Sequence, residues 1–127
     1  MLIVEDDLPT RELYVFLLTQ AGFAARAAHN GRQALDACRE RRPALVLTDI
    51  RLPGLDGFEL ARELRLLFQD DTPPIVAITG FAPKDSDSRL ERAGFQRLLV
   101  KPVTPDLLIS AVTEALSTRT EHPGAST

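Results

Sequence analysis

The segment Ala44-Leu45-Val46-Leu47-Thr48-Asp49 is a short apolar run that ends in a carboxylate. It lacks the polar alternation of a half-exposed strand, as expected when helices cover both faces of a parallel sheet. Amphipathic stretches separate it from four similar runs, which are Leu2–Val4, Ala24–Ala27, Ile75–Ile78 and Leu98–Val100. This alternation is typical of repeated βα units. It predicts an α/β fold, a doubly wound five-stranded parallel sheet with helices on both faces.

The first two connecting segments have helical spacing of their apolar residues. Gly22 gives the first helix a stop signal, and Asn30 gives the second, Asn30–Glu40, an N-cap. The residues expected on the core sides of these two helices are Leu13, Phe16, Leu17 and Ala21 in the first, and Ala34, Ala37 and Cys38 in the second.

Three further helices are expected. The stretch Pro83–Ala93 is polar, so tertiary packing can hold it only weakly and it should be the loosest helix. Thr104-Pro105 opens the last helix with an N-cap followed by proline in the first turn. The apolar residues expected on the core sides are Leu60, Leu64, Leu67 and Phe68 in the third helix, and Leu108, Ala111, Val112, Ala115 and Leu116 in the last.

The whole chain has the size and composition of one globular domain. Its 127 residues are 44% hydrophobic and 26% charged, and no apolar run is long enough to cross a bilayer. The N-terminus lacks the basic opening of a signal peptide, so a cytoplasmic location is expected. A net charge of -3 gives no positive field for binding nucleic acid. We expect one domain over residues 1–117 and a flexible tail over residues 118–127.

Chemically active side chains follow four of the five predicted strands. Glu5-Asp6-Asp7 follows the first strand, Asp49 the third, Thr79-Gly80 the fourth and Lys101-Pro102 the fifth. Parallel α/β sheets bind ligands beyond the carboxyl ends of their strands. Carboxylates gathered there repel one another unless a cation neutralises them.

Oxygen ligands without His or Cys favour magnesium, manganese or calcium, and magnesium is the usual companion of phosphoryl chemistry. Lys101 and Thr79 add a positive charge and a hydroxyl donor for phosphoryl oxygens. Asp49 is then the best-placed carboxylate to attack phosphorus and form an acyl phosphate. Each element has a plainer explanation as well: Asp7 before Leu8-Pro9 fits helix capping better than metal contact, and Lys-Pro and Thr-Gly are common turn signals.

Four motifs together resemble the receiver domains of two-component signalling, over nearly the whole chain from Leu2 to Leu116. The resemblance implies a flavodoxin-like (βα)5 fold with strand order 2-1-3-4-5. The motifs are Leu2-Ile3-Val4-Glu5-Asp6-Asp7, Leu47-Thr48-Asp49-Ile50-Arg51-Leu52-Pro53-Gly54-Leu55-Asp56-Gly57, Ile78-Thr79-Gly80 and Val100-Lys101-Pro102.

The resemblance also implies a role for each site residue. Asp49 is the phosphoacceptor, and Thr79 and Lys101 bind phosphoryl oxygens, with help from the Gly80 amide. Mg²⁺, or Mn²⁺ as a second choice, is coordinated by Glu5, Asp6, Asp49 and the backbone carbonyl of Arg51. The family also leaves room for a cis Lys101–Pro102 bond, although the sequence alone does not determine the isomer.

The partners implied are a sensor histidine kinase or a histidine phosphotransfer domain as phosphodonor. The output partner would bind the face formed by the fourth helix, fifth strand and fifth helix, and the protein would be a monomer or a weak, phosphorylation-dependent dimer. Such a domain is a switch that catalyses its own phosphorylation and dephosphorylation, and is not otherwise an enzyme. One departure is Leu98, three residues before the lysine, where many family members carry an aromatic that changes rotamer on activation.

Three other functions have weaker support in the sequence. A receiver-like interaction module that takes no phosphoryl group would not need the full set of site residues found here. A magnesium-dependent aspartyl phosphatase would carry Asp-x-Asp after the first strand, where this chain has Glu5-Asp6-Asp7. A metal-dependent nucleic-acid-cleaving fold would need a carboxylate where this chain has Arg51.

Overall fold

The computed structural model describes residues 1–80 and 92–121, the last four of these by backbone alone. Five parallel strands form one sheet in the order β2-β1-β3-β4-β5, which confirms the predicted fold class and strand order. The strands are β1 (Leu2–Val4), β2 (Arg26–Ala28), β3 (Val46–Asp49), β4 (Ile75–Thr79) and β5 (Arg97–Val100). The second strand therefore begins two residues later than predicted.

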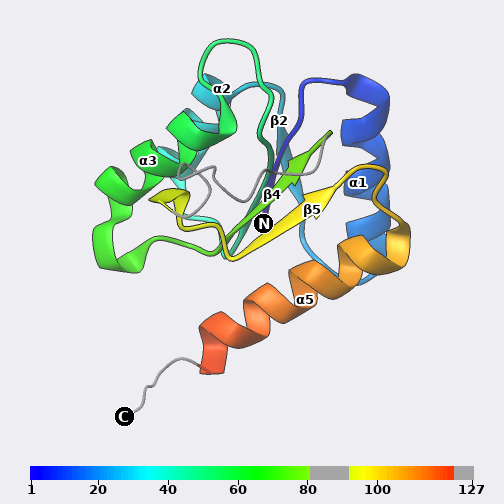
Figure 1. Ribbon diagram of the computed structural model, residues 1–127. Helices are drawn as coiled ribbons and strands as arrows, with labels where there is room; N and C mark the ends of the chain where they lie inside the picture. The colour runs from blue at the N-terminus through cyan, green and yellow to red at the C-terminus, as the bar shows by residue number, and fades with distance from the viewer. Residues whose placement is uncertain (81–91, 122–127) are drawn as a thin grey trace.

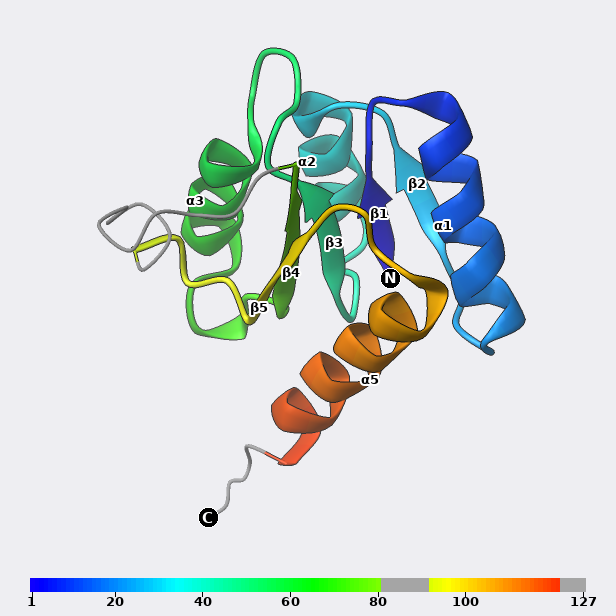
Figure 2. The same cartoon turned by 45° about the vertical axis from the view of Figure 1, so that its right-hand side comes forward.

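The described helices lie on both faces of the sheet. They are α1 (Leu8–Gln20), α2 (Gly31–Glu40), α3 (Gly57–Phe68) and α5 (Pro105–Glu121), with a short 3-10 helix at Gln69–Asp71. Figures 1 and 2 show α2 and α3 together on one face and α1 and α5 on the other. The helix predicted over Pro83–Ala93 lies mostly outside the described residues. No helix in the described part of the chain is long and apolar enough to span a membrane.

Side-chain alternation along the buried strands divides the core into two layers. In β1, Leu2 and Val4 pack toward α2 and α3, whereas Ile3 packs toward α1 and α5. All three side chains are almost completely buried. A three-residue strand can therefore be apolar throughout, because each of its faces is covered.

Most of the predicted helix boundaries and caps are confirmed. Asn30 caps α2 by accepting a hydrogen bond from the Gln33 amide, and Thr104 accepts one from the Leu107 amide. Asp56 and Glu59 form a capping box at the start of α3. Helix α5 is described as far as Glu121, so it includes the first four residues of the predicted tail.

In α1, Leu17 packs against the core as predicted, but the rest of the predicted core face of this helix is wrong. Its buried residues are Tyr14 and Leu18, whereas Leu13 and Phe16 are more than half exposed. Because α1 carries apolar residues around most of its circumference, spacing alone could not identify the inward side. Leu67 in α3 is likewise exposed, and Ala61 takes the place beside Leu60 and Leu64 in the core. The predicted core residues of α2 and α5 lie on the inward sides.

Two leucines on α1 test the corrected face directly. Leu18→Ala should lower the free energy of unfolding by about 2–5 kcal/mol, because Leu18 is completely buried. Leu13→Ala is the matched control on the same helix, and should change the stability by no more than about 0.5 kcal/mol. Urea unfolding followed by circular dichroism measures both. Equal losses for the two variants would contradict the orientation of α1.

Candidate functional site

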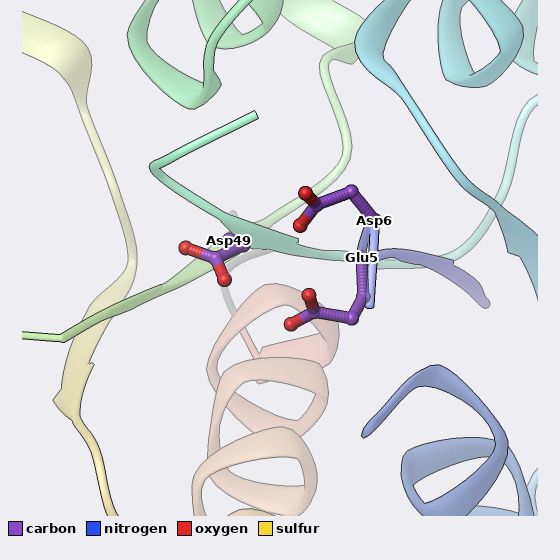
Figure 3. A group of neighbouring side chains, drawn as sticks. All are labelled: Glu5, Asp6 and Asp49. Carbon is purple, nitrogen blue, oxygen red and sulfur yellow. The ribbon is translucent and has the colours of Figure 1, made fainter. Parts of the chain in front are cut away.

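The site lies where the carboxyl ends of β1, β3, β4 and β5 meet at one edge of the sheet. Glu5 and Asp6 follow β1, and Asp49 is the last residue of the neighbouring strand β3. Figure 3 shows Glu5 and Asp6 extending from their turn to the side on which the Asp49 carboxylate lies. A carboxylate oxygen from each of the three lies within 4.8 Å of the others. The sheet thus brings together residues separated by more than forty positions in the sequence.

The turn between β1 and α1 separates the roles of three consecutive acidic residues. Asp7 is the N-cap of α1 and accepts a hydrogen bond from the Thr10 amide, 3.1 Å away. The Asp7 amide in turn donates to Glu5 Oε2 at 3.0 Å. Asp7 is thus a helix cap, as predicted, and stands outside the acidic cluster of Glu5, Asp6 and Asp49.

Asp49 is 5% exposed and is held through both of its carboxylate oxygens. The Arg51 amide donates to Oδ1 at 3.0 Å, and Lys101 Nζ donates to Oδ2 at 2.8 Å. The described contact of Arg51 with the cluster is thus through its amide. The coordinating role expected of its carbonyl stays a prediction.

Gly57 lets α3 begin close to the backbone of Asp49. A Cβ on Gly57 would lie 2.7 Å from the Asp49 carbonyl oxygen and 2.7 Å from the Ile50 Cα. The Gly57 amide also donates to the Ile50 carbonyl at 2.8 Å. Any larger residue would push α3 away from the end of β3. In the sequence Gly57 is only part of a motif, and the Asp56-Gly57 pair gives no sign of this contact.

Lys101 links the ends of β4 and β5 to the acidic cluster. Its amide donates to the Thr79 carbonyl at 2.8 Å, and the Lys101–Pro102 bond is cis. Its side-chain ammonium lies 2.8 Å from Asp49 Oδ2 and 3.6 Å from Glu5 Oε1. Burial by itself lowers the pKa of Lys101, but the hydrogen bond and charge of Asp49 outweigh it and raise that pKa overall. Lys101 is therefore a permanent positive charge in the site.

Thr79 ends β4 and is 4% exposed. It pairs with Val100 in the ladder between β4 and β5, directly before Lys101. Its backbone is therefore fixed beside the lysine. The exposed Gly80 follows it at the rim of the site.

Glu5 is an acid of the cluster whose ionised form is disfavoured by its surroundings. Its side chain is 2% exposed, and Oε1 is buried without a hydrogen-bond partner in the described part of the chain. Burial, together with the nearby charge of Asp49, raises the pKa of Glu5 to about 7. A buried carboxylate oxygen without a hydrogen bond is costly, and the Lys101 ammonium 3.6 Å from Oε1 offsets only part of that cost.

The donor set suits a hard divalent cation. Glu5, Asp6 and Asp49 offer carboxylate oxygens, and the unpartnered Glu5 Oε1 is one of the atoms that such an ion would satisfy. No nitrogen or sulfur ligand belongs to this cluster, which favours magnesium or manganese over zinc. The residues present therefore fit the ion predicted from the sequence.

Arg11 is a further residue of the site, and it was not predicted from the sequence. Its guanidinium Nη1 donates to the Glu5 carbonyl at 2.9 Å. An arginine in the first turns of a helix reads as an ordinary surface charge, so the sequence held no signal for this contact.

Comparison with known proteins gives consistent results. The family model of the response regulator receiver domain matches residues 1–113. A protein of Leptolyngbya boryana, described as an uncharacterized 14.6 kDa protein, is 37% identical over 88% of this chain and 86% of its own length. The polar-differentiation response regulator DivK of Brucella anthropi is 33% identical over 88% of this chain and 91% of its own.

Solved structures agree with the fold as well. The receiver domain of NtrX from Brucella abortus superimposes with a TM-score of 0.83 at 33% identity, covering 92% of this chain and 98% of that one. The chemotaxis response regulator CheY4 of Vibrio cholerae gives a TM-score of 0.83 at 26% identity, covering 90% and 95%.

The raised pKa of Glu5 predicts a pH effect on the metal-free protein. The folded state holds the Glu5 proton up to a pH of about 7, whereas the unfolded chain releases it near its ordinary value of 4.5. Protonated Glu5 therefore makes its full contribution to the free energy of unfolding below pH 4.5. This contribution is lost as the pH rises through 7. The Glu5→Gln variant has no group that titrates at this position. Its free energy of unfolding, relative to that of the native protein, should therefore increase from pH 5 to pH 8.

Urea unfolding in EDTA across this pH range measures the difference. Excess magnesium at pH 8 should then stabilise the native protein more than Glu5→Gln. If the free energies of unfolding of the two proteins differ by the same amount at every pH, the raised pKa of Glu5 is contradicted.

Proposed function

Since the chain belongs to the response regulator receiver domain family, we propose that it accepts a phosphoryl group on Asp49, with Mg²⁺, in a two-component phosphorelay. The observation that carries this proposal is the surroundings of Asp49: a lysine ammonium donates to its carboxylate, and two further acids have carboxylate oxygens within 4.8 Å of it. The carboxylate is thereby fixed in place beside both a positive charge and a set of cation ligands.

Asp49 would act as the nucleophile. One of its oxygens attacks the phosphorus of a phosphohistidine, and the P–N bond breaks as the new P–O bond forms. The imidazole leaves with the electron pair of the P–N bond, and the product is an acyl phosphate. Because Asp49 is held by the Arg51 amide and by Lys101, it does not have to be oriented during the reaction.

Charge is the main obstacle to this reaction, since a dianionic phosphoryl group must approach three carboxylates. Glu5, Asp6 and Asp49 would hold a magnesium ion, which would supply positive charge to offset this repulsion. Lys101 supplies a second positive charge from the β5 side. It already donates to Asp49 and would donate to a phosphoryl oxygen bound there.

Thr79 would respond to the new charge. Its hydroxyl, at the end of β4, can donate to a phosphoryl oxygen on Asp49, and its backbone is joined to Lys101. Movement there would alter the surface formed by the fourth helix, β5 and α5, which is the proposed output face. The fourth helix falls largely outside the described residues, and Leu98 in β5 has no hydroxyl or ring to move with Thr79.

The partners follow from this chemistry. The phosphodonor is a phosphohistidine on a sensor kinase or a phosphotransfer domain, and the output partner binds the altered face. The protein accepts and releases its own phosphoryl group and turns over no other substrate. An interaction module without phosphorylation would have no use for a buried Glu5 oxygen that makes no hydrogen bond beside Asp49.

Intact mass after incubation with acetyl phosphate and magnesium tests the proposal. The native protein should gain one phosphoryl group, whereas Asp49→Asn should gain none, because an amide cannot form the acyl phosphate. Asp36→Asn is a matched control, since Asp36 is an exposed aspartate on α2. It should be phosphorylated like the native protein. Omitting magnesium should abolish the adduct in every variant.

Fast hydrolysis would hide a real adduct, so beryllium fluoride binding is the second measurement. Beryllium fluoride imitates a phosphoryl group on the carboxylate, and should bind the native protein with magnesium but not Asp49→Asn. Neither adduct nor beryllium fluoride binding in the native protein would contradict the proposal and favour the interaction module.

A further inference from the structure

Arg11 occupies a position that local helix rules disfavour. Asp7 is the N-cap of α1 and Leu8 its first residue, so Arg11 lies within the first turns, where the helix dipole repels positive charge. The N-cap Asp7, four residues before Arg11, offsets part of this charge. A residue that breaks a local rule is often retained for what it does elsewhere in the structure.

The side chain of Arg11 is on the inward side of α1. Tyr14 and Leu18, which are three and seven residues further along, are the buried residues of this helix, and Arg11 is partly buried on the same side. It is thus the member of this inward row that is closest to the carboxyl edge of the sheet, where the acidic cluster lies.

The guanidinium contacts the backbone of both acids that follow β1. Its Nη1 lies 2.9 Å from the Glu5 carbonyl oxygen and 3.5 Å from that of Asp6. Strand β1 ends at Val4, and the Glu5 amide makes one last bond to the Ala28 carbonyl. Beyond that bond the chain has left the sheet, and the Glu5 carbonyl takes its donor from Arg11.

We propose that Arg11 is a positioning residue for the cation site: by holding the carbonyls of Glu5 and Asp6, it keeps both carboxylates directed at Asp49. This proposal rests on the proposed function, because it concerns how the same site binds its metal ion. Without an ion, the carboxylates of Glu5, Asp6 and Asp49 repel one another and favour movement of the turn away from β3. Arg11 opposes that movement from outside the cluster, since it touches the backbone and not the carboxylates.

Arg11 therefore acts before phosphoryl transfer. Its loss should weaken cation binding while leaving the reaction at saturating cation nearly unchanged. Residues that orient metal ligands in this way typically contribute about 10–100-fold to affinity. Since Arg11 contacts carbonyls and not ligand atoms, we expect the low end of that range.

The experiment compares Mg²⁺ affinity in the unphosphorylated protein by titration calorimetry. Arg11→Gln cannot reach the carbonyls and should bind Mg²⁺ about tenfold more weakly. Arg11→Lys keeps the charge but has one donor group on a shorter side chain, and should fall between Arg11→Gln and the native protein. Arg62→Gln removes an exposed charge from α3 and should match the native protein.

Two further readouts separate positioning from a purely structural role. The magnesium concentration that gives half-maximal phosphorylation by acetyl phosphate should rise in Arg11→Gln by the same factor as the dissociation constant. The rate at saturating magnesium should stay within about twofold of the native rate. A lower melting temperature with unchanged Mg²⁺ affinity would overturn the proposal.

Failure of this inference and failure of the proposed function give different results. A native protein that binds no Mg²⁺ contradicts the proposed function. A native protein that binds Mg²⁺ with the same affinity as Arg11→Gln contradicts only the role of Arg11. If Arg11→Gln does not fold, Arg11→Lys decides, and native affinity in that variant overturns the inference.

Discussion

The repulsion among Glu5, Asp6 and Asp49 is the constraint on which the rest of the structure depends. Their carboxylates gather at one edge of the sheet, and two of the three are almost fully buried. Water cannot screen the two buried carboxylates, so fixed positive charge and hydrogen-bond donors must do so. Lys101, the Arg51 amide and the Asp7 amide supply part of that compensation. The buried Glu5 Oε1 makes no hydrogen bond and has only the Lys101 ammonium at 3.6 Å, so a cation would complete its compensation.

The fold and the members of this cluster could be predicted because both depend on patterns that are local in the sequence. Each buried strand reads as a continuous apolar run, and each of the four strands that feed the site is followed at once by a chemically distinctive residue. Parallel pairing then brings those ends to one edge without further information. Caps such as Asp7 and Asn30 were predictable for the same reason, since a cap and the amide it accepts from are three residues apart.

What the sequence concealed depends on three-dimensional neighbours. Helix α1 is apolar on more than one side, and its contact with α5 buries Tyr14 and Leu18 and leaves Phe16 exposed. The close approach of Gly57 to Asp49 is invisible until α3 is packed on β3. Arg11 is the clearest case, because in the sequence it reads as an ordinary surface charge four residues after Asp7. Its guanidinium donates to the Glu5 carbonyl, which needs this donor only because β1 ends one residue earlier.

The contacts around the acids also explain how a strained site can have a fixed shape. Each acid is anchored through its backbone by a group outside the cluster: Arg11 holds the Glu5–Asp6 turn, and Gly57 allows α3 to brace the end of β3. The backbone then cannot move to reduce the repulsion among the carboxylates. This repulsion therefore favours the binding of a cation. The cost of that strain falls on the folded state, and the two-layered core beneath the site must supply the stability that offsets it.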